Sequence, residues 1–373
     1  MNVGSFFKAL ETQYANQLPF VVYSRPINSL IKCWLQEDDV LHTSQSFSES
    51  GFVFSPFDIK DLSILLPEAH CEHHILETDS LEVKEFESAI DTLDSDEINH
   101  VNLVSKGIET IKDGHLEKVV LSRIVEKQNQ DTNPIEIFKR LFNTYKNAMV
   151  YCWYHPKVGL WLGATPELLF KVEGKQLTTI SLAGTQPYNN NNNNDPKWTN
   201  KELDEQQIVT DFISHQLKPY TKQIHISEVA TVRAGNLLHL KTRITSLIDN
   251  TSSLKSIIEA LHPTPAVCGL PKQEAKDFIL DNENYNREYY TGFLGELNLK
   301  QSKTRNTNRR NVENNAYAVV KTQSNFYVNL RCMQLKANKA FIYVGGGITK
   351  DSNANKEWEE TVNKTKTIAN VLD

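Results

Sequence analysis

The segment WLGATPELLF, residues 161–170, places one carboxylate, Glu167, among large apolar side chains. An ionised carboxylate that leaves water loses hydration free energy, and a partner or a proton has to offset that loss. An incidental buried ion pair would be the simplest explanation. Glu167 is therefore the first residue whose role the rest of the sequence has to explain.

Two segments predicted to be helical carry further carboxylates in an unusual arrangement. In the first, Thr199 and Glu202 fit a capping box at the helix start. Glu202 and Glu205 are three residues apart, and Val209 and Phe212 continue the same face. This spacing predicts that both carboxylates point toward the buried side. The alternative is an acidic first turn that suits the helix dipole.

The second acidic segment is the C-terminal helix, residues 354–372, in which Glu357, Glu360 and Lys364 form a stripe beside the apolar face. Glu360 and Lys364 are spaced as an i,i+4 pair, which could be ordinary surface support. Carboxylates from two helices would, however, suit Mg²⁺, which usually takes one or two carboxylates together with waters and substrate.

Two basic residues stand in predicted apolar strands, Arg331 inside FYVNLRCMQL and Lys118 at the start of KVVLSR. A guanidinium there needs an anion, either a protein carboxylate or a substrate carboxylate held bidentately. A partly buried lysine can act as a base. Structural ion pairs explain many residues of this kind, so both interpretations stay open at this point.

A run of three glycines, Gly345 to Gly347, follows the strand-like stretch KAFIY. We predict a glycine-rich turn whose backbone N–H groups can approach an anion, although such a turn is often only a turn. No Lys-Ser or Lys-Thr pair follows at the spacing of a phosphate-binding P-loop.

The composition bounds the class of protein. The 373 residues are 39% hydrophobic, enough for a sizeable core, and the formal net charge of −6 gives no reason to expect nucleic-acid binding. The five cysteines are scattered, so neither a disulfide framework nor a structural zinc site is expected. With neither a secretory signal nor a membrane-spanning segment in view, we expect a cytoplasmic protein that does not bind membranes.

The order of predicted elements favours one large α/β (α+β) domain, residues 1–373, with mainly antiparallel sheets. Its first hundred residues differ from the part from 118 onward, and the polar segments 188–200 and 300–315 are predicted to be loops. Strands are predicted at 20–26, 51–57, 118–127, 148–156, 159–172, 176–185, 316–323, 326–337 and 339–347, and helices at 134–146, 200–218, 252–260, 271–281 and 354–372.

From about residue 118 to the end, the motifs resemble those of the chorismate-utilising enzymes, and most closely the isochorismate synthases within that family. They occur in the family's order over roughly 250 residues, the size of one catalytic domain. The matching stretches are KVVLSR (118–123), GATPELLF (163–170), SLAGT (181–185), KELDEQQIV (201–209), LLHLKT (237–242), LHPTPAVCGLP (261–271), YYTGFLGEL (289–297), VNLRCMQL (328–335), YVGGGIT (343–349) and EWEETVNK (357–364).

The resemblance implies two large packed antiparallel sheets with outer helices, a cleft between them, chorismate as substrate and Mg²⁺ as cofactor. It makes Lys118 the general base that activates water and Glu167 the general acid that protonates the departing ring hydroxyl. An apolar setting suits that acid, because it raises the pKa of a carboxyl group. Arg331 matches the clamp on the enolpyruvyl carboxylate. The remaining matches are metal ligands or their acidic partners (Glu205, Glu360, Glu202, Glu357) and positions that line or contact the substrate (Gly184, Thr185, His239, Val267, Gly345, Gly347, Lys364).

Within the family, the presence of Lys118 favours water over ammonia as the nucleophile, so no amidotransferase subunit is expected. A salicylate synthase, which goes on to eliminate pyruvate, and a catalytically silent chorismate-binding protein remain alternatives. The product is expected to feed menaquinone or siderophore synthesis. The chain departs from many relatives at Gln186, where they carry arginine, and at Gln206, where they carry histidine.

Overall fold

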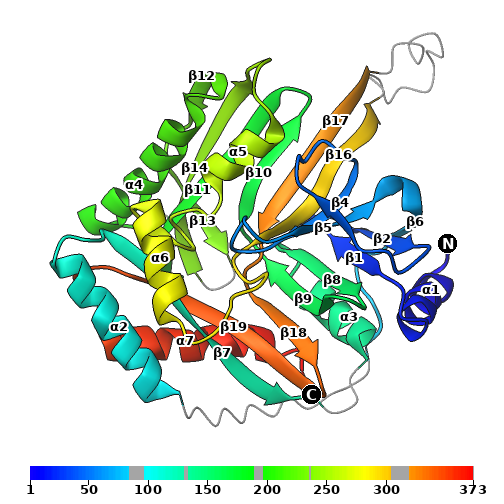
Figure 1. Cartoon of the computed structure of the whole chain (residues 1–373), viewed down its shortest axis with the longest axis horizontal. Coiled ribbons are helices and arrows are strands. Elements are labelled where there is room, and N and C mark those ends of the chain that lie inside the picture. Colours follow the sequence, from blue (N-terminus) through cyan, green and yellow to red (C-terminus); the bar gives the residue numbers. More distant parts are fainter. Residues whose placement is uncertain (84–95, 130–132, 189–195, 235–236, 304–318, 373) are drawn as a thin grey trace.

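The structure is a computed structural model that describes residues 1–83, 96–129, 133–188, 196–234, 237–303 and 319–372. It contains two large antiparallel sheets with helices packed on their outer faces (Figure 1). The predicted fold class is therefore confirmed. No helix in these described ranges is long and apolar enough to cross a membrane.

The first sheet, called sheet A here, has nine strands in the order β15-β7-β19-β18-β9-β8-β1-β2-β6. All its neighbouring strands run antiparallel. The strands are β1 (Phe20–Ser24), β2 (Leu30–Gln36), β6 (Cys71–Glu77), β7 (Lys118–Gln128), β8 (Met149–His155), β9 (Gly159–Thr165), β15 (Gly269–Leu270), β18 (Cys332–Lys336) and β19 (Lys339–Ile348).

The second sheet, sheet B, has the order β12-β14-β11-β10-β17-β16-β4-β5-β3, and β13 also pairs with β14. Its strands are β3 (His42–Ser44), β4 (Gly51–Ser55), β5 (Ser63–Pro67), β10 (Leu168–Glu173), β11 (Gln176–Pro187), β12 (Thr221–Ile226), β13 (Ala230–Ala234), β14 (Leu237–Ile248), β16 (Phe293–Lys303) and β17 (Val319–Val328).

The five predicted helices are present within a few residues of their expected bounds. Two further helices, α1 and α2, were missed, because the first hundred residues were interpreted as strands and an acidic stretch. The helices are α1 (Val3–Ala15), α2 (Glu97–Lys112), α3 (Pro134–Thr144), α4 (Asn200–Leu217), α5 (Leu254–Leu261), α6 (Lys272–Asn282) and α7 (Ala354–Ala369), with a 3-10 turn η1 (Glu68–His70).

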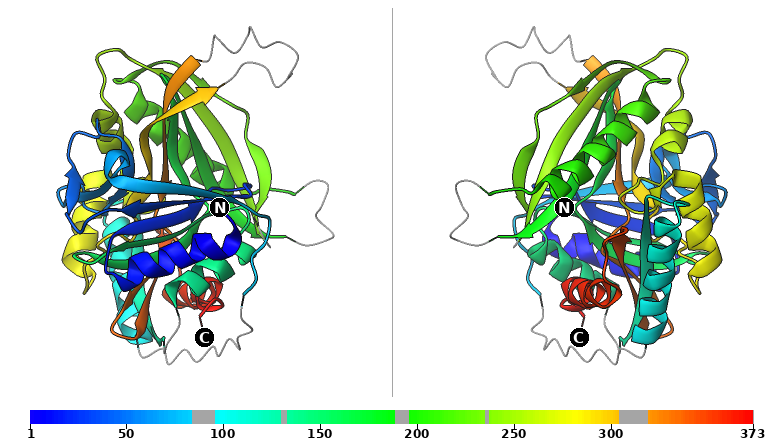
Figure 2. Two further views of the ribbon diagram at one scale, coloured as in Figure 1. Left: turned by 90° about the vertical axis from the view of Figure 1, so that its right-hand side faces the viewer. Right: turned by 90° about the vertical axis from the view of Figure 1, so that its left-hand side faces the viewer.

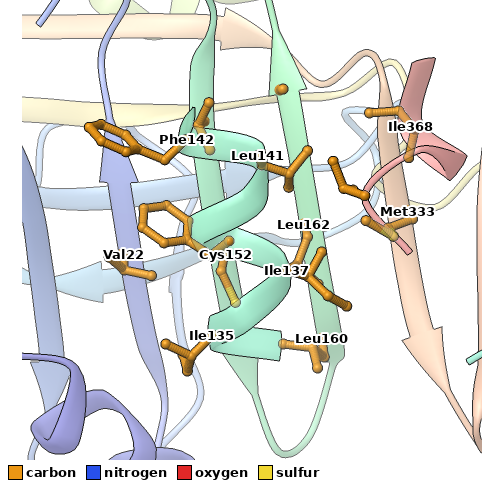
Figure 3. Close-up of a cluster of buried hydrophobic side chains, with 14 of the residues drawn as sticks. Val22, Ile135, Ile137, Leu141, Phe142, Cys152, Leu160, Leu162, Met333 and Ile368 are labelled. Atoms are coloured by element: carbon orange, nitrogen blue, oxygen red, sulfur yellow. The ribbon is translucent and has the colours of Figure 1, made fainter. Parts of the chain in front are cut away.

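Helices cover the outer faces of both sheets. On sheet A, α1 and α3 pack beside β1, β2, β8 and β9, while α2, α6 and α7 lie along β7, β15 and β19 (Figure 2). On sheet B, α4 covers β11 and β14 and also contacts α5. The core under α3, drawn in Figure 3, is built from fully buried aliphatic and aromatic side chains such as Val22, Ile137, Leu141 and Leu162.

A separate core fills the space between the two sheets, and it is rich in aromatic rings. Phe54 of sheet B lies 4.7 Å from Trp153 of sheet A between ring centroids and stacks on Tyr289 at 4.3 Å. Trp161 stacks on Tyr343 at 5.2 Å. Large rings bury much apolar area each, so this layer holds the two sheets together.

Three expectations from the sequence are corrected. The predicted strand 159–172 is two strands in different sheets, β9 and β10, separated by Pro166 and Glu167. Arg331 is not inside a strand; it lies between β17 and β18 with a left-handed φ of 48°. Gly345 to Gly347 do not form a turn, because they pair with β7 inside β19. The sheet changes within the segments 159–172 and 326–337 were missed because apolar residues continue on both sides of each of them. The pairing of the three glycines with β7 involves a strand more than two hundred residues earlier in the chain.

The predicted loops lie largely outside the described residues. Of the segment 300–315, residues up to Lys303 belong to β16, so that part of the prediction is wrong. Of the segment 188–200, Asn200 already opens α4.

Candidate active site

Two crossovers between the sheets lie side by side and form the base of the site. The chain passes from sheet A to sheet B at Pro166 and Glu167, and it returns from sheet B to sheet A at Arg331. The Val328 amide donates to the Glu167 carbonyl oxygen at 3.0 Å, and the Ala164 amide donates to the Arg331 carbonyl oxygen at 3.0 Å. The backbone itself therefore brings the predicted acid and the predicted clamp together.

Glu167 is the most perturbed carboxyl group of the site. Glu167 is partly exposed, but its surroundings remove enough water that burial raises its pKa from 4.5 to about 7. The positive charges of Lys118 and Arg331 oppose that shift without cancelling it. A carboxyl group in this state holds a proton near neutral pH and can release it, as a general acid requires.

Lys118 is the first residue of β7, and its side chain lies against Gly347 of β19. A β-carbon added at Gly347 would lie 3.0 Å from Lys118 Cε and 3.5 Å from its Nζ. Gly347 therefore leaves room for the lysine side chain. Because the Lys118 charge acts on the Glu167 carboxyl, the predicted base and the predicted acid share one site.

The Arg331 guanidinium is partly exposed, and no ion pair or side-chain hydrogen bond holds it within the described residues. Burial lowers its pKa, and the neighbouring Tyr145 and Glu167 side chains raise it again in part. An arginine without a protein carboxylate as partner suits the capture of a carboxylate from solution.

His239 and Gly184 lie on two neighbouring interior strands of sheet B, β14 and β11. The His239 Nδ1 atom is 3.1 Å from the Gly184 carbonyl oxygen, so Nδ1 carries the hydrogen in this contact. Burial lowers the pKa of His239, and the nearby Arg331 charge lowers it further. Thr185 pairs with His239 across β11 and β14, while its side chain lies outside the described structure.

The predicted acidic residues divide into two groups. Glu202 accepts hydrogen bonds from the Thr199 backbone N–H and hydroxyl, which confirms the capping box. The Glu205 side chain is outside the described structure. On α7, a β-carbon at Gly346 would lie 3.3 Å from Glu357 Oε2 and 3.9 Å from Glu360 Oε1.

Lys364 joins the same corner of the site. Its Nζ lies 2.7 Å from Glu360 Oε1 and donates to the Gly345 carbonyl oxygen at 2.8 Å. Within the described side chains, no three or more His, Cys, Asp or Glu groups are gathered as a metal site. Of the four glutamates predicted to form the metal site, two, Glu357 and Glu360, lie together on α7 beside Gly346.

Val267 is buried at 1% exposure in the segment before β15. Its carbonyl oxygen accepts a hydrogen bond from Arg287 Nη1 at 3.0 Å. The two unusual glutamines also have defined places. Gln206 donates to the Ser181 carbonyl oxygen at 3.1 Å and to Thr242 Oγ1 at 3.0 Å. Gln186 Nε2 is buried and has no hydrogen-bond partner among the side chains and backbone that the structure describes.

One residue at the site was missed in the sequence. The Tyr290 hydroxyl lies 3.0 Å from the position of a β-carbon at Gly345. Burial raises the pKa of Tyr290, the Arg287 charge lowers it in part, and Glu167 makes the smallest contribution. The only sequence signal was the stretch YYTGFLGEL, in which nothing distinguishes a tyrosine at the site from one in the core.

Comparison with known proteins defines the class. Residues 60–303 match the model of a family described as "Chorismate binding enzyme", and residues 316–370 match a second model described in the same words. The chain therefore belongs to the chorismate-binding enzyme family.

Curated relatives of this chain include proteins named isochorismate synthases. The chain is 28% identical over 292 residues to isochorismate synthase MenF of Pasteurella multocida, covering 74% of this chain and 62% of that protein. It is 26% identical over 276 residues to the salicylate biosynthesis isochorismate synthase of Pseudomonas aeruginosa, covering 72% and 53%. In both cases the match spans less than two thirds of the relative's length.

A solved structure agrees with the fold. The menaquinone-specific isochorismate synthase MenF of Escherichia coli superimposes with a TM-score of 0.76 at 22% identity, covering 95% of this chain and 89% of that chain. At this level of identity the likeness concerns the arrangement of the sheets and helices.

Proposed function

We propose that the protein is an isochorismate synthase, which converts chorismate to isochorismate by adding water to the ring and expelling the ring hydroxyl. The observation that carries the proposal is Glu167, a carboxyl group with a pKa of about 7 that lies within reach of the charges of Lys118 and Arg331. Two relatives of the chain are named isochorismate synthases, which supports the same reaction.

The roles follow from the properties of each group. Lys118 takes a proton from the attacking water, and Glu167 gives its proton to the departing hydroxyl, because hydroxide is a poor leaving group. The Arg331 fork binds the enolpyruvyl carboxylate. His239, Gly184 and Thr185 line the substrate on the sheet B side.

Magnesium is part of the proposal. Glu205 and Glu360 would hold Mg²⁺ against the ring carboxylate, with Glu202 and Glu357 as acidic partners. The α7 half of this set fits, since Glu357 and Glu360 both present carboxylate oxygens beside Gly346, where no side chain intervenes. When bound, the ion would neutralise the ring carboxylate.

The finer points of the proposal concern product and setting. We infer that isochorismate is the final product and that it supplies menaquinone or siderophore synthesis in the cytoplasm. We also infer that the chain needs neither an amidotransferase subunit nor a nucleic-acid partner. The alternative activity is that of a salicylate synthase, since pyruvate elimination could follow in the same site.

Product analysis tests the activity directly. The protein is incubated with chorismate and Mg²⁺, with and without ammonium, and the products are separated by chromatography. Isochorismate in both cases is the expected result. Salicylate and pyruvate would establish the alternative, an amino product from the wild type would contradict the role of Lys118, and unchanged chorismate would identify a silent binding protein.

Variants of the acidic residues test the metal. Glu205→Gln and Glu360→Gln should each abolish activity at low Mg²⁺ while the circular dichroism spectrum stays unchanged, since removing one anionic ligand weakens a site that has few. The matched control is Glu359→Gln, an exposed glutamate on α7 beside Glu360. Wild-type turnover of either ligand variant at low Mg²⁺ would show that the assignment is wrong.

A further inference from the structure

Strand β7, which begins with Lys118, has an incomplete neighbour on one side. β15 is only two residues long, and it pairs Gly269 with Val119 and Leu270 with Lys118. Past this point the Val120 amide still donates to the Cys268 carbonyl oxygen at 2.8 Å, and two side chains supply the next partners in place of a strand. Arg287 Nη2 donates to the Val120 carbonyl oxygen at 2.7 Å, and the Ser122 amide donates to Glu283 Oε1 at 2.8 Å.

These two side chains form a buried ion pair with a bidentate geometry. Arg287 Nε lies 2.7 Å from Glu283 Oε2, and Nη2 lies 2.6 Å from Oε1. The side chains are 2% and 1% exposed, respectively. Glu283 is the C-cap of α6, so its backbone is anchored independently of β7.

The same guanidinium also reaches two other parts of the site. Its Nη1 atom donates to the Val267 carbonyl oxygen at 3.0 Å and to Thr291 Oγ1 at 3.2 Å. Thr291 directly follows Tyr290, whose hydroxyl lies near Gly345. One buried cation therefore connects β7, the segment before β15 and the segment before β16.

A buried ion pair contributes little net stability compared with well-packed apolar residues, because both charges lose their hydration. Its geometry, by contrast, is strict, since an arginine fork satisfies its acceptors only in a narrow range of positions. Val120 is held between Arg287 on one side and Gly347, its register partner, on the other. Lys118 lies two residues before that fixed point.

We propose that Glu283 and Arg287 are positioning residues for Lys118: they fix the start of β7 so that the lysine amine meets the attacking water. The inference rests on the proposed function, because it assigns a purpose to the geometry of the proposed base. Neither residue is among those proposed to contact the substrate, and of the segments that they hold, β7 is the one that both contact and that carries the base.

Arg287→Lys and Glu283→Gln test the proposal. Each keeps much of the volume of the original side chain, but the first removes the fork and the second the charge. We expect kcat to fall by about 10- to 100-fold, the loss typical of a misplaced catalytic group. KM should stay within about threefold, because the clamp and the metal side of the site are untouched.

The decisive measurement is a double-mutant cycle on kcat with Lys118→Ala, followed in single turnover at high enzyme concentration. If Arg287 acts through Lys118, then Arg287→Lys should cost less than about twofold once the lysine is absent. The control is Glu296→Gln, a carboxylate equally buried at 1% exposure but located in β16. Its small effect on kcat should be the same in both backgrounds.

The positioning role would be overturned if Arg287→Lys lowered kcat by the same factor in the Lys118→Ala background as in the wild type. It would also be overturned if the substitution changed KM more than kcat. If Arg287→Lys fails to fold, the cycle with Glu283→Gln decides the question. Failure of the proposed function looks different, because the wild type would then form no isochorismate at all.

Discussion

Two buried glutamates, Glu167 and Glu296, show how this fold sets the state of a carboxyl group. Both lose hydration, which by itself raises the pKa. At Glu296, the charges of Lys32 and Arg25 and the hydrogen bonds of Lys32 and Tyr23 outweigh burial, and the pKa falls below its usual value. At Glu167, nearby cations oppose burial less effectively, and the pKa rises to about 7.

The two pKa values differ because cationic and hydroxyl groups touch Glu296 directly, whereas the cations near Glu167 do not. Lys32 Nζ sits 2.7 Å from Glu296 Oε1 and the Tyr23 hydroxyl 2.6 Å from the same atom, so this carboxylate is satisfied by its own protein. The cations near Glu167 act on it only through space within the described residues. The first arrangement joins two sheets; the second leaves a proton available for chemistry.

The largest expected effect comes from Glu167→Gln, which keeps the shape and removes the transferable proton. Isochorismate formation should fall by about 10²- to 10⁴-fold, the usual contribution of a general acid. Lys118→Ala should lose a similar factor with water, yet it should form some amino product when ammonium is supplied. Chromatography of the products distinguishes the two, and a Glu167→Gln variant with the wild-type rate would refute the assignment.

The next largest effect is expected for Arg331→Lys. An ammonium cannot replace a bidentate fork, so KM for chorismate should rise by about 10- to 100-fold, in line with the loss of one strong charged contact of 1.5–3 kcal/mol. Steady-state kinetics measures the change, and Lys339→Arg on the exposed end of β19 serves as a charge-conserving control. An unchanged KM would leave Arg331 with a structural role only.

The pH dependence separates the two glutamates by sign. Because Glu167 must carry its proton, kcat/KM should fall above a pH of about 7, approaching tenfold per unit. The raised pKa also means that folding stability is lost as pH rises from 4.5 to about 7, and Glu167→Gln should remove that loss. A melting curve series that shows no such difference between the variant and the wild type would contradict the raised pKa.

Glu296→Gln should have the smallest effect on turnover, less than about threefold, because no proposed catalytic group depends on it. Its cost should appear in the free energy of unfolding, about 2–4 kcal/mol at neutral pH, since Lys32 and Arg25 lose their shared partner. The lowered pKa gives this contribution the opposite sign: it is present above pH 4.5 and disappears as pH falls through the folded pKa. Urea unfolding at pH 7 and pH 3 tests it.

The sequence predicted the architecture well where a single element carried a clear period. Helix α4 begins at Asn200, directly after the capping Thr199, because the capping box is a local signal. Helix α1 was missed although Phe6, Phe7 and Leu10 form its buried face, since the strand-like pieces that follow dominated the interpretation of that region.

The site was harder to predict because its geometry depends on pairing between distant strands. Glu167 and Arg331 both lie where the chain changes sheets. Pro166 is a local signal for the first break, because proline cannot donate to a strand ladder, whereas no proline or glycine marks the second. Similarly, nothing in the sequence around Arg287 indicates that its side chain supports a strand. Only the short length of β15 reveals why its fork is needed.

The placement of β7 also has a consequence for the order in which the molecule can be made. Both strands that flank Lys118, β15 and β19, lie far downstream of it in the chain. During synthesis from the N-terminus, β7 therefore leaves the ribosome long before either neighbour exists. Strands β1, β2, β8 and β9 of sheet A can pair earlier, whereas the strand that carries the base has to wait until β15 and β19 have been made.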